Sequence, residues 1–296
     1  MTEKGGFAYL PSGFQERLKN VEIRVRKPIV GDRQNQHRSK TFGSSVEFAQ
    51  YREYMEGDPL QRIDWNVYAR SDKYVIRQSF EEVNAKTYVL LDISASMNWQ
   101  GSGKMTKLDY GRYLAAGMLF TMVKQGDSAG LVTFDRKIRH FDQPVSSAMG
   151  IRPMLEHLEN IEAGEPGDVE AVLHETAELA RGKVLIILIS DLLQDAESII
   201  RGLHHLRHGG KEITIFHVLD PMEISLHGVK GLAELTELES KKDIVVDMDA
   251  IRESYQRKVQ QHLSDLKRRC LDMGLDYELG DTNTDPFSLI RKRGQV

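Results

Sequence analysis

The sequence predicts an α/β protein with a doubly wound, mostly parallel sheet and an N-terminal extension. From about residue 85 onward, short apolar runs of strand length alternate with segments of helical periodicity, as expected of strand–helix–strand units. Residues 184–189, VLIILI, are consecutive apolar residues, as in a central parallel strand covered on both faces. In such sheets, ligands bind beyond the carboxyl ends of the strands, where the strand order reverses.

The first predicted elements of this sheet are a strand at residues 88–91 and a helix that begins at Thr106. Asp109 follows Thr106 at the spacing of a capping box, which is typical of a helix N-terminus. Residues 129–134 and 138–141 have the composition of two strands joined by a tight turn, so we expect a hairpin there.

The remaining elements continue the alternation. They are helices near residues 147–158, 168–180 and 196–208, strands at 184–189, 213–219 and 275–279, a short strand at 244–246 and a helix from Asp285. Residues 221–243 form a polar, Glu/Lys-rich connection. A long amphipathic helix precedes Gly274, and we interpret its apolar stripe as core packing. The stripe consists of Ile251, Tyr255, Val259, Leu263, Leu266, Cys270 and Met273.

The composition indicates a globular protein of a reducing compartment. With 296 residues, 40% of them hydrophobic, the chain can bury a large core. Its single cysteine, Cys270, excludes an internal disulfide. No run reaches the roughly 18 apolar residues that a membrane span requires, and the first residues lack the apolar segment of a signal peptide. We therefore expect a cytoplasmic protein without a membrane span.

Charge is spread unevenly along the chain. The net charge is −4, yet residues 1–40 carry nine Lys/Arg against four Asp/Glu. This basic arm could bind nucleic acid or an acidic partner, or it could pack on its own acidic body. We favour the second interpretation, because the arm lacks the interleaved aromatic residues of a single-strand binder. Nucleic-acid binding remains an alternative.

An Asp-x-Ser-x-Ser turn follows the first strand of the predicted sheet. Asp92, Ser94 and Ser96 supply one carboxylate and two hydroxyls, and Asp191 follows the apolar strand VLIILI. Because the carboxyl ends of parallel strands meet at one edge of a sheet, we expect Asp92 and Asp191 to share a rim. Hard oxygen donors of this kind suit Mg²⁺ or Mn²⁺. Either aspartate could instead cap the helix that follows it.

Two enzymatic interpretations compete with a cation-binding turn. Residues 101–105, GSGKM, resemble a phosphate-binding P-loop only superficially, because the upstream glycine spacing is wrong and Met105 replaces the hydroxyl residue. A metal-dependent phosphohydrolase with Asp92 as nucleophile is the stronger alternative, since nucleophilic carboxylates occur at strand ends. Haloacid-dehalogenase-like enzymes, however, place a second aspartate where this chain has Ser94. We therefore favour a binding protein that is not an enzyme.

These residues carry a family resemblance. Asp92, Ser94 and Ser96 resemble the Asp-x-Ser-x-Ser element of the metal-ion-dependent adhesion site (MIDAS) in von Willebrand factor A domains, and Asp191 looks like the second aspartate of that site. Upstream, the block that contains YREYMEGDPLQRIDWNVYAR is similar to the block before the A domain in the bacterial domain-of-unknown-function family fifty-eight. The resemblance runs from about residue 37 to the C-terminus.

The resemblance implies an architecture and a role. Residues 85–296 would form a six-stranded, Rossmann-like A domain, and residues 1–84 a basic extension that contains the upstream block. Members of that family are typically encoded beside MoxR-type AAA+ ATPases. The protein would then be a partner or adaptor of such an ATPase in protein complex assembly or maturation, and other A-domain proteins are further candidate partners. An acidic side chain of the bound protein would complete the metal's coordination.

Two features are left open by the resemblance. The adhesion-site pattern has a threonine in the loop before the strand that ends at Asp191, where this chain has Gly167 and Asp168. Asp168 could ligate the metal directly, or the site could bind its metal weakly or not at all.

In the upstream block, arginines alternate with aromatic residues, which suits packing against the A domain. Trp65 and Arg70 could alternatively form a docking surface for the partner, since aromatic residues and arginine dominate interface hot spots.

Overall fold

The computed structural model describes residues 7–24, 46–55, 57–58, 60–81, 85–226, 230–236 and 243–294. The chain divides into two compact units, one made of Met1–Lys27 with Ala85–Val296 and the other of Pro28–Asn84. The division between the two units falls after Asn84. Residues 7–24, which the sequence analysis grouped with the extension, lie in the larger unit.

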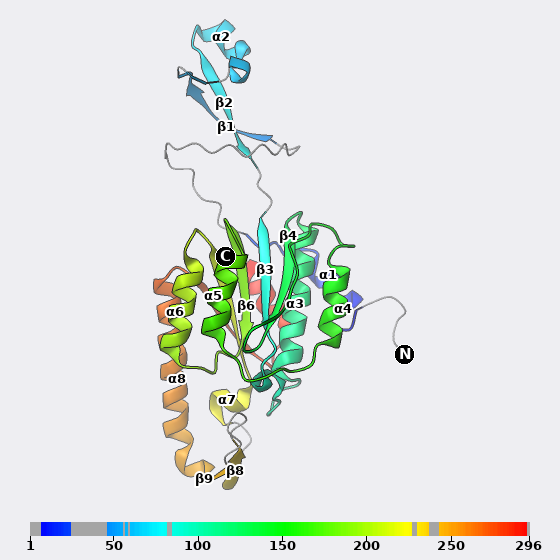
Figure 1. Ribbon diagram of the computed structural model, residues 1–296, viewed down its shortest axis with the longest axis vertical. Coiled ribbons are helices and arrows are strands. Elements are labelled where there is room, and N and C mark those ends of the chain that lie inside the picture. Colours follow the sequence, from blue (N-terminus) through cyan, green and yellow to red (C-terminus); the bar gives the residue numbers. More distant parts are fainter. Residues whose placement is uncertain are drawn as a thin grey trace. The chain divides into compact units, whose positions relative to one another are not determined.

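A six-stranded sheet forms the centre of the larger unit (Figure 1). Its strands, in spatial order, are β10 (Asp276–Asp281), β7 (Glu212–Leu219), β6 (Val184–Ser190), β3 (Lys86–Asp92), β4 (Ser128–Phe134) and β5 (Ile138–Phe141). All neighbouring strands are parallel except β4 and β5, which confirms the predicted mostly parallel sheet. Because the chain order reverses between β3 and β6, their carboxyl ends mark the place where such sheets bind ligands.

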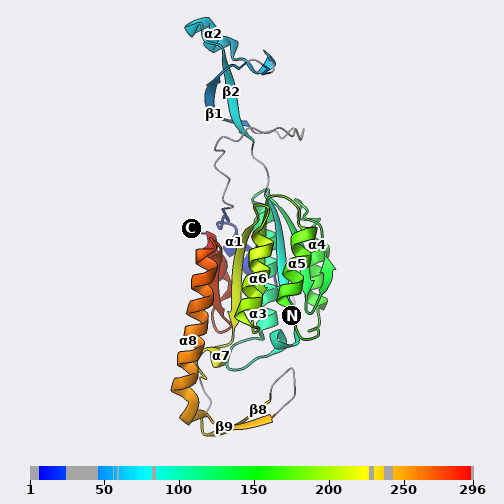
Figure 2. The same cartoon turned by 60° about the vertical axis from the view of Figure 1, so that its left-hand side comes forward.

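Helices cover both faces of this sheet (Figures 1 and 2). One core contains residues of α1 (Ser12–Leu18), α3 (Lys107–Lys124), α4 (Arg152–Asn160) and α9 (Pro286–Gly294). The other contains residues of α5 (Val169–Leu179), α6 (Ala196–Arg207) and α8 (Met248–Asp272). Alternate residues of β3 point to opposite faces, so Leu91 enters the first core and Leu90 the second. In the ranges that the structure describes, no helix combines the length and apolar character needed to cross a bilayer.

Most of the predicted elements in the larger unit are confirmed. Thr106 caps α3, and its side-chain oxygen accepts a hydrogen bond from the backbone N–H of Asp109 at 3.0 Å. The expected hairpin forms between β4 and β5. Every residue of β6 is buried, which explains why its sequence shows no alternation of apolar and polar residues.

The region after residue 220 contains more structure than the sequence predicts. The expected connection includes α7 (Pro221–Ser225) and β8 (Leu232–Thr236), and β8 pairs with β9 (Asp243–Asp247). Within the apolar stripe of α8, only Leu266 and Cys270 are buried. The start of α8 extends beyond the sheet toward the β8–β9 hairpin (Figure 2), so the interpretation of the whole stripe as core packing is wrong for its first half.

The described part of the basic arm packs on the larger unit. Phe14 and Leu18 of α1 are buried in the core that contains α3. Arg17 forms an ion pair with Asp285. Apolar residues at helical spacing therefore anchor the described part of the arm on the larger unit despite the charge of the arm. The most basic part of the arm, residues 25–40, lies outside the described residues.

The smaller unit is built on an antiparallel hairpin that the sequence did not predict. It consists of β1 (Val46–Glu53) and β2 (Val75–Glu81), with the short helix α2 (Trp65–Ser71) between them. Asp64 caps α2 by accepting a hydrogen bond from Asn66 N at 3.0 Å. An arginine–aspartate ion pair forms inside the unit, where Arg52 Nη2 contacts Asp58 Oδ2 at 2.8 Å.

Candidate cation site at the sheet edge

Asp92 ends β3 and lies almost completely buried, with 2% of its surface exposed. Its Oδ1 accepts a hydrogen bond from Ser94 N at 2.8 Å, and its Oδ2 accepts one from Ser190 Oγ at 2.6 Å. Both donors are neutral. Among the described residues, no lysine or arginine forms an ion pair with this carboxylate, so its negative charge is buried without a cationic partner.

The electrostatic consequence is a raised pKa. Burial is the largest cause and the neighbouring charge of Asp191 is the second, and together they raise the pKa of Asp92 to about 7. Hydrogen bonds from Ser190 and Ser94 act in the opposite direction but do not outweigh burial. A buried carboxylate of this kind is stabilised by any cation that comes near it.

Two hydroxyls complete the turn. Ser94 Oγ and Ser96 Oγ lie 3.2 Å apart, and Ser94 is as deeply buried as Asp92. The short 3-10 helix Ala95–Asn98 follows directly, so the turn is fixed by regular structure on both sides. The predicted carboxylate and hydroxyls are therefore brought together at one strand end.

Asp191 follows β6 on the same rim, and a lysine that the sequence analysis did not identify is its partner. Lys107 Nζ lies 2.7 Å from Asp191 Oδ2 and 2.6 Å from Glu223 Oε1. The side chain of Lys107 has no exposed surface. Burial lowers the pKa of Lys107, but the charges of Asp191 and Glu223 outweigh it and leave the pKa above its usual value. Lys107 is therefore a fixed positive charge beside the candidate site.

The backbone around Asp191 is held in an unusual conformation. Leu192 is buried with a φ of +47°, a left-handed conformation that a leucine rarely adopts. Its N–H donates to Ser190 Oγ at 3.0 Å. Burial lowers the pKa of His217 to about 4, so the ring is neutral; its Nε2 donates to the carbonyl of Asp191 at 2.7 Å. Strained backbone of this kind occurs where a structure fixes side chains for function.

The loop before α5 lies against the serine turn. Gly164 N donates to the carbonyl of Ile93 at 2.6 Å, and a Cβ added to Gly167 would lie 3.3 Å from Ser94 Cβ. Asp168 is next, and its Oδ1 accepts a hydrogen bond from Ala171 N at 3.0 Å as the N-cap of α5. The structure thus places Asp168 as a helix cap at the edge of the site, where the adhesion-site pattern has threonine.

The GSGKM segment binds an internal anion. The backbone N–H groups of Gly101, Ser102 and Gly103 donate to the carboxylate of Asp220 at 3.1, 2.9 and 2.9 Å. A Cβ on Gly103 would lie 2.0 Å from Thr282 Oγ1, so this position requires glycine. The backbone N–H groups that a P-loop would offer to phosphate are here occupied by Asp220.

The residues at the rim fit a hard divalent cation. Asp92, Ser94, Ser96 and Asp191 are all oxygen donors, and Asp92 carries an uncompensated charge. Within the described part of the chain, no group of three or more His, Cys, Asp or Glu side chains is arranged to hold a metal ion. A cation here would therefore rely on the serine hydroxyls and water for much of its coordination.

The proposed docking residues lie in the smaller unit on an exposed aromatic strip. Trp65 is 57% exposed and meets Tyr68 edge to face, with ring centres 6.0 Å apart. Tyr68 stacks on Tyr74 at 4.5 Å, and Arg70 is exposed on the same helix as Trp65. Exposed aromatic rings that pack on one another form a rigid apolar surface.

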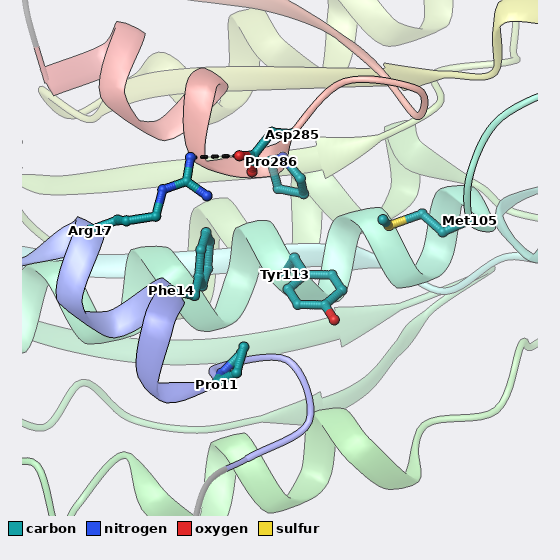
Figure 3. A pocket seen from close by; sticks show the side chains of 7 residues that line it. All are labelled: Pro11, Phe14, Arg17, Met105, Tyr113, Asp285 and Pro286. Carbon is teal, nitrogen blue, oxygen red and sulfur yellow. Dashed lines mark hydrogen bonds and ion pairs between the residues drawn. The ribbon is translucent and has the colours of Figure 1, made fainter.

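A shallow hollow of about 280 Å³ lies elsewhere on the larger unit (Figure 3). It is lined by Pro11, Phe14, Arg17, Met105, Tyr113, Asp285 and Pro286. Figure 3 shows the Arg17–Asp285 ion pair at its edge. The hollow marks the seam where the N-terminal arm meets α3 and α9, and it does not include the rim residues.

Comparison with known proteins identifies one matching family and several relatives. The family described as "Protein of unknown function DUF58" matches residues 50–265. Uncharacterized proteins Mb1516 from Mycobacterium bovis and Rv1480 from Mycobacterium tuberculosis are each 25% identical over 264 residues, which cover 85% of this chain and 79% of the relative.

Among solved structures, the chain is similar to the conserved hypothetical protein BatB from Bacteroides thetaiotaomicron. The identity is 14% and the TM-score 0.45, over 72% of this chain and 100% of the other. An aerotolerance-related membrane protein from Bacteroides fragilis gives 15% identity and a TM-score of 0.46 over the same shares. The SpRpn10 VWA domain gives 14% and 0.42, over 71% of this chain and 94% of that domain.

Proposed function

The chain belongs to the family of proteins of unknown function DUF58, and we propose that it is a non-enzymatic, metal-dependent protein-binding module that partners a MoxR-type AAA+ ATPase. The observation that carries the proposal is the environment of the Asp92 carboxyl group. This group is buried beside a second carboxylate, and its hydrogen bonds come from neutral groups. Burying such a charge is costly unless a cation compensates it.

In this proposal, Asp92, Ser94 and Ser96 hold Mg²⁺ or Mn²⁺, and Asp191 contributes through water. Each of these side chains is positioned by regular structure at the edge of the sheet. A bound divalent cation supplies an electrophilic position that a carboxylate of another protein can occupy. Asp168 is a further candidate ligand, because its cap position adjoins Gly167 beside the serine turn.

The same features favour binding over phosphoryl transfer. A nucleophilic carboxylate must reach its substrate, whereas Asp92 is 2% exposed and both of its oxygens accept hydrogen bonds. The position two residues on carries the hydroxyl of Ser94 and not a second carboxyl group. A phosphohydrolase remains the alternative that a turnover assay would reveal.

A second part of the proposed interface is the aromatic strip of the smaller unit. Trp65 and Tyr74 expose about half of their surfaces, and Arg70 is a neighbouring positive charge. Large rigid aromatics and arginine supply most of the binding energy at typical protein interfaces. We propose that this strip contributes affinity, while the cation contributes selectivity for an acidic residue of the partner.

The direct test is affinity for a purified MoxR-type AAA+ ATPase, measured by calorimetry in Mn²⁺ and in EDTA. We expect binding in Mn²⁺ that weakens at least tenfold in EDTA and in Asp92→Ala, since the bridging cation is lost. Trp65→Ala should weaken binding in both buffers, because the aromatic strip does not require the metal.

Matched controls separate folding from binding. Glu197→Gln changes the same formal charge at an exposed ion pair with Arg269 and should bind the ATPase normally. Thermal melting would show that each variant is folded. Unchanged affinity in folded Asp92→Ala would refute the metal-bridged mechanism, and phosphoester turnover lost in Asp92→Asn would favour the enzyme.

A further inference from the structure

Lys107 sits between two carboxylates with different surroundings. Asp191 belongs to the proposed cation site, whereas Glu223 lies on α7, away from the serine turn in the sequence. The two contacts are nearly equal in length, so neither carboxylate holds the ammonium alone. The positive charge of Lys107 repels a divalent cation at the rim. The negative charge of Glu223 offsets part of this repulsion.

Glu223 is fixed in place by its own neighbours. Its Oε2 accepts a hydrogen bond from Asp220 N at 2.9 Å, as part of the capping box of α7. Its backbone carbonyl accepts one from the hydroxyl of Tyr255 on α8 at 2.7 Å. The carboxylate is therefore held toward Lys107 whether or not a cation is present.

The charges of the cluster balance with a divalent cation. Asp92, Asp191 and Glu223 are three carboxylates, and Lys107 is the one ammonium that pairs with any of them among the described residues. When all are ionised, the cluster has two negative charges in excess, which one Mg²⁺ or Mn²⁺ would neutralise. Without Glu223, the cluster would have only one negative charge in excess, which is less than the charge of the divalent cation.

We infer that the Lys107–Glu223 ion pair sets the divalent-cation affinity of the rim site, with Lys107 opposing the cation and Glu223 as the positioning residue that limits this opposition. This inference rests on the proposed function, because it concerns the same site. In this inference, the carboxylate of Glu223 changes the affinity for the cation without binding the metal itself. Contacts of α7 and α8 determine where this carboxylate lies.

The test is calorimetric titration of MnCl₂ into the full chain, freed of metal, at fixed low salt. Lys107→Met should bind Mn²⁺ at least tenfold more tightly than the native chain, since it keeps the side-chain volume and removes the opposing charge. Glu223→Gln should bind at least threefold more weakly. In the Lys107→Met background, Glu223→Gln should have a much smaller effect, because the ammonium that it positions is gone.

Glu197→Gln serves as the control, since it removes one carboxylate from an exposed pair 2.7 Å from Arg269 and should leave Mn²⁺ affinity unchanged. If Lys107→Met does not fold, the Mn²⁺ affinity of Glu223→Gln alone tests the inference. We expect this variant to fold, because the carboxylate of Glu223 is partly exposed and the change is conservative. An equal effect of Glu223→Gln in both Lys107 backgrounds would overturn the inference.

The outcomes distinguish the inference from the proposed function. Binding by the native chain with no change in Lys107→Met or Glu223→Gln would overturn the inference and leave metal binding intact. Binding only after Lys107→Met would support the inference and overturn metal dependence in the native protein. The absence of binding in every folded variant would overturn both.

Discussion

Asp92 ends one strand of the central sheet and Asp220 follows another, yet their environments are opposite. Asp220 is fully buried and accepts hydrogen bonds from four backbone N–H groups, those of Gly101, Ser102, Gly103 and Met222. Asp92 is equally buried but accepts one backbone and one hydroxyl hydrogen bond. The difference lies in the number of donors that the fold aims at each carboxylate.

The pKa values follow from this difference. Burial raises the pKa of Asp220, but backbone hydrogen bonds from Met222, Gly103 and their neighbours outweigh it and leave the pKa below its usual value. At Asp92, burial and Asp191 prevail and raise the pKa to about 7. A buried carboxylate with many backbone donors is a structural anchor, whereas one with few donors beside a second carboxylate is costly to ionise unless a cation is near.

The largest expected effect is the loss of Asp220. Asp220→Ala leaves the N–H groups of the 101–103 loop without an acceptor inside the protein, so we expect a loss of about 5 kcal/mol in unfolding free energy. Urea unfolding followed by circular dichroism would measure it. Asp220→Asn, which keeps one carbonyl oxygen, should cost about 2 kcal/mol. A loss below 1 kcal/mol in Asp220→Ala would show that the loop does not depend on this anchor.

The second prediction concerns pH. Folding raises the pKa of Asp92 from its ordinary value of 3.8 to about 7, so the folded state keeps a proton that the unfolded state releases. In EDTA, the contribution of Asp92 to the free energy of unfolding should therefore be largest below about pH 4. It should fall by at most about 4 kcal/mol as the pH rises to about 7 and then level off.

The variant Asp92→Asn has no ionisable group at this position, so its comparison with the native chain isolates the pH-dependent contribution of Asp92 to stability. Urea unfolding at several pH values should show the native chain losing stability relative to Asp92→Asn between pH 4 and pH 7. Added Mn²⁺ should restore the native chain at pH 8 and leave the variant unchanged, because the cation compensates the ionised carboxylate. A constant difference across this range would contradict the assignment of the raised pKa.

The smallest expected effect on stability is at the serine hydroxyls. Ser94→Ala with Ser96→Ala removes two groups that contact each other, so the unfolding free energy should change by less than about 1 kcal/mol. Mn²⁺ affinity should nevertheless fall at least tenfold, which is about 1.4 kcal/mol of binding free energy. Calorimetry on the double variant would measure it. Retained affinity would mean that the carboxylates alone hold the cation.

The sequence indicated which residues lie at this rim because the signals are local. Strand ends, an Asp-x-Ser-x-Ser turn and a run of buried residues are all visible within a few positions, and the sheet then brings Asp92 and Asp191 together. The hairpin of β1 and β2 was missed, because its pairing joins residues on either side of the segment that contains α2. The role of α8 was misjudged, since periodicity shows an apolar face but not what covers it.

By itself, the sequence determined the fold class, the Thr106 cap of α3, and the strand ends at which Asp92 and Asp191 lie. Only the tertiary structure decided the charges around them. Lys107 reaches Asp191 across 84 residues and Glu223 across 116, and the GSGKM loop reaches Asp220 across more than 100. Local patterns encode periodicity and turn chemistry, whereas the pairing of a buried charge depends on which distant groups the packed sheet brings within hydrogen-bond reach.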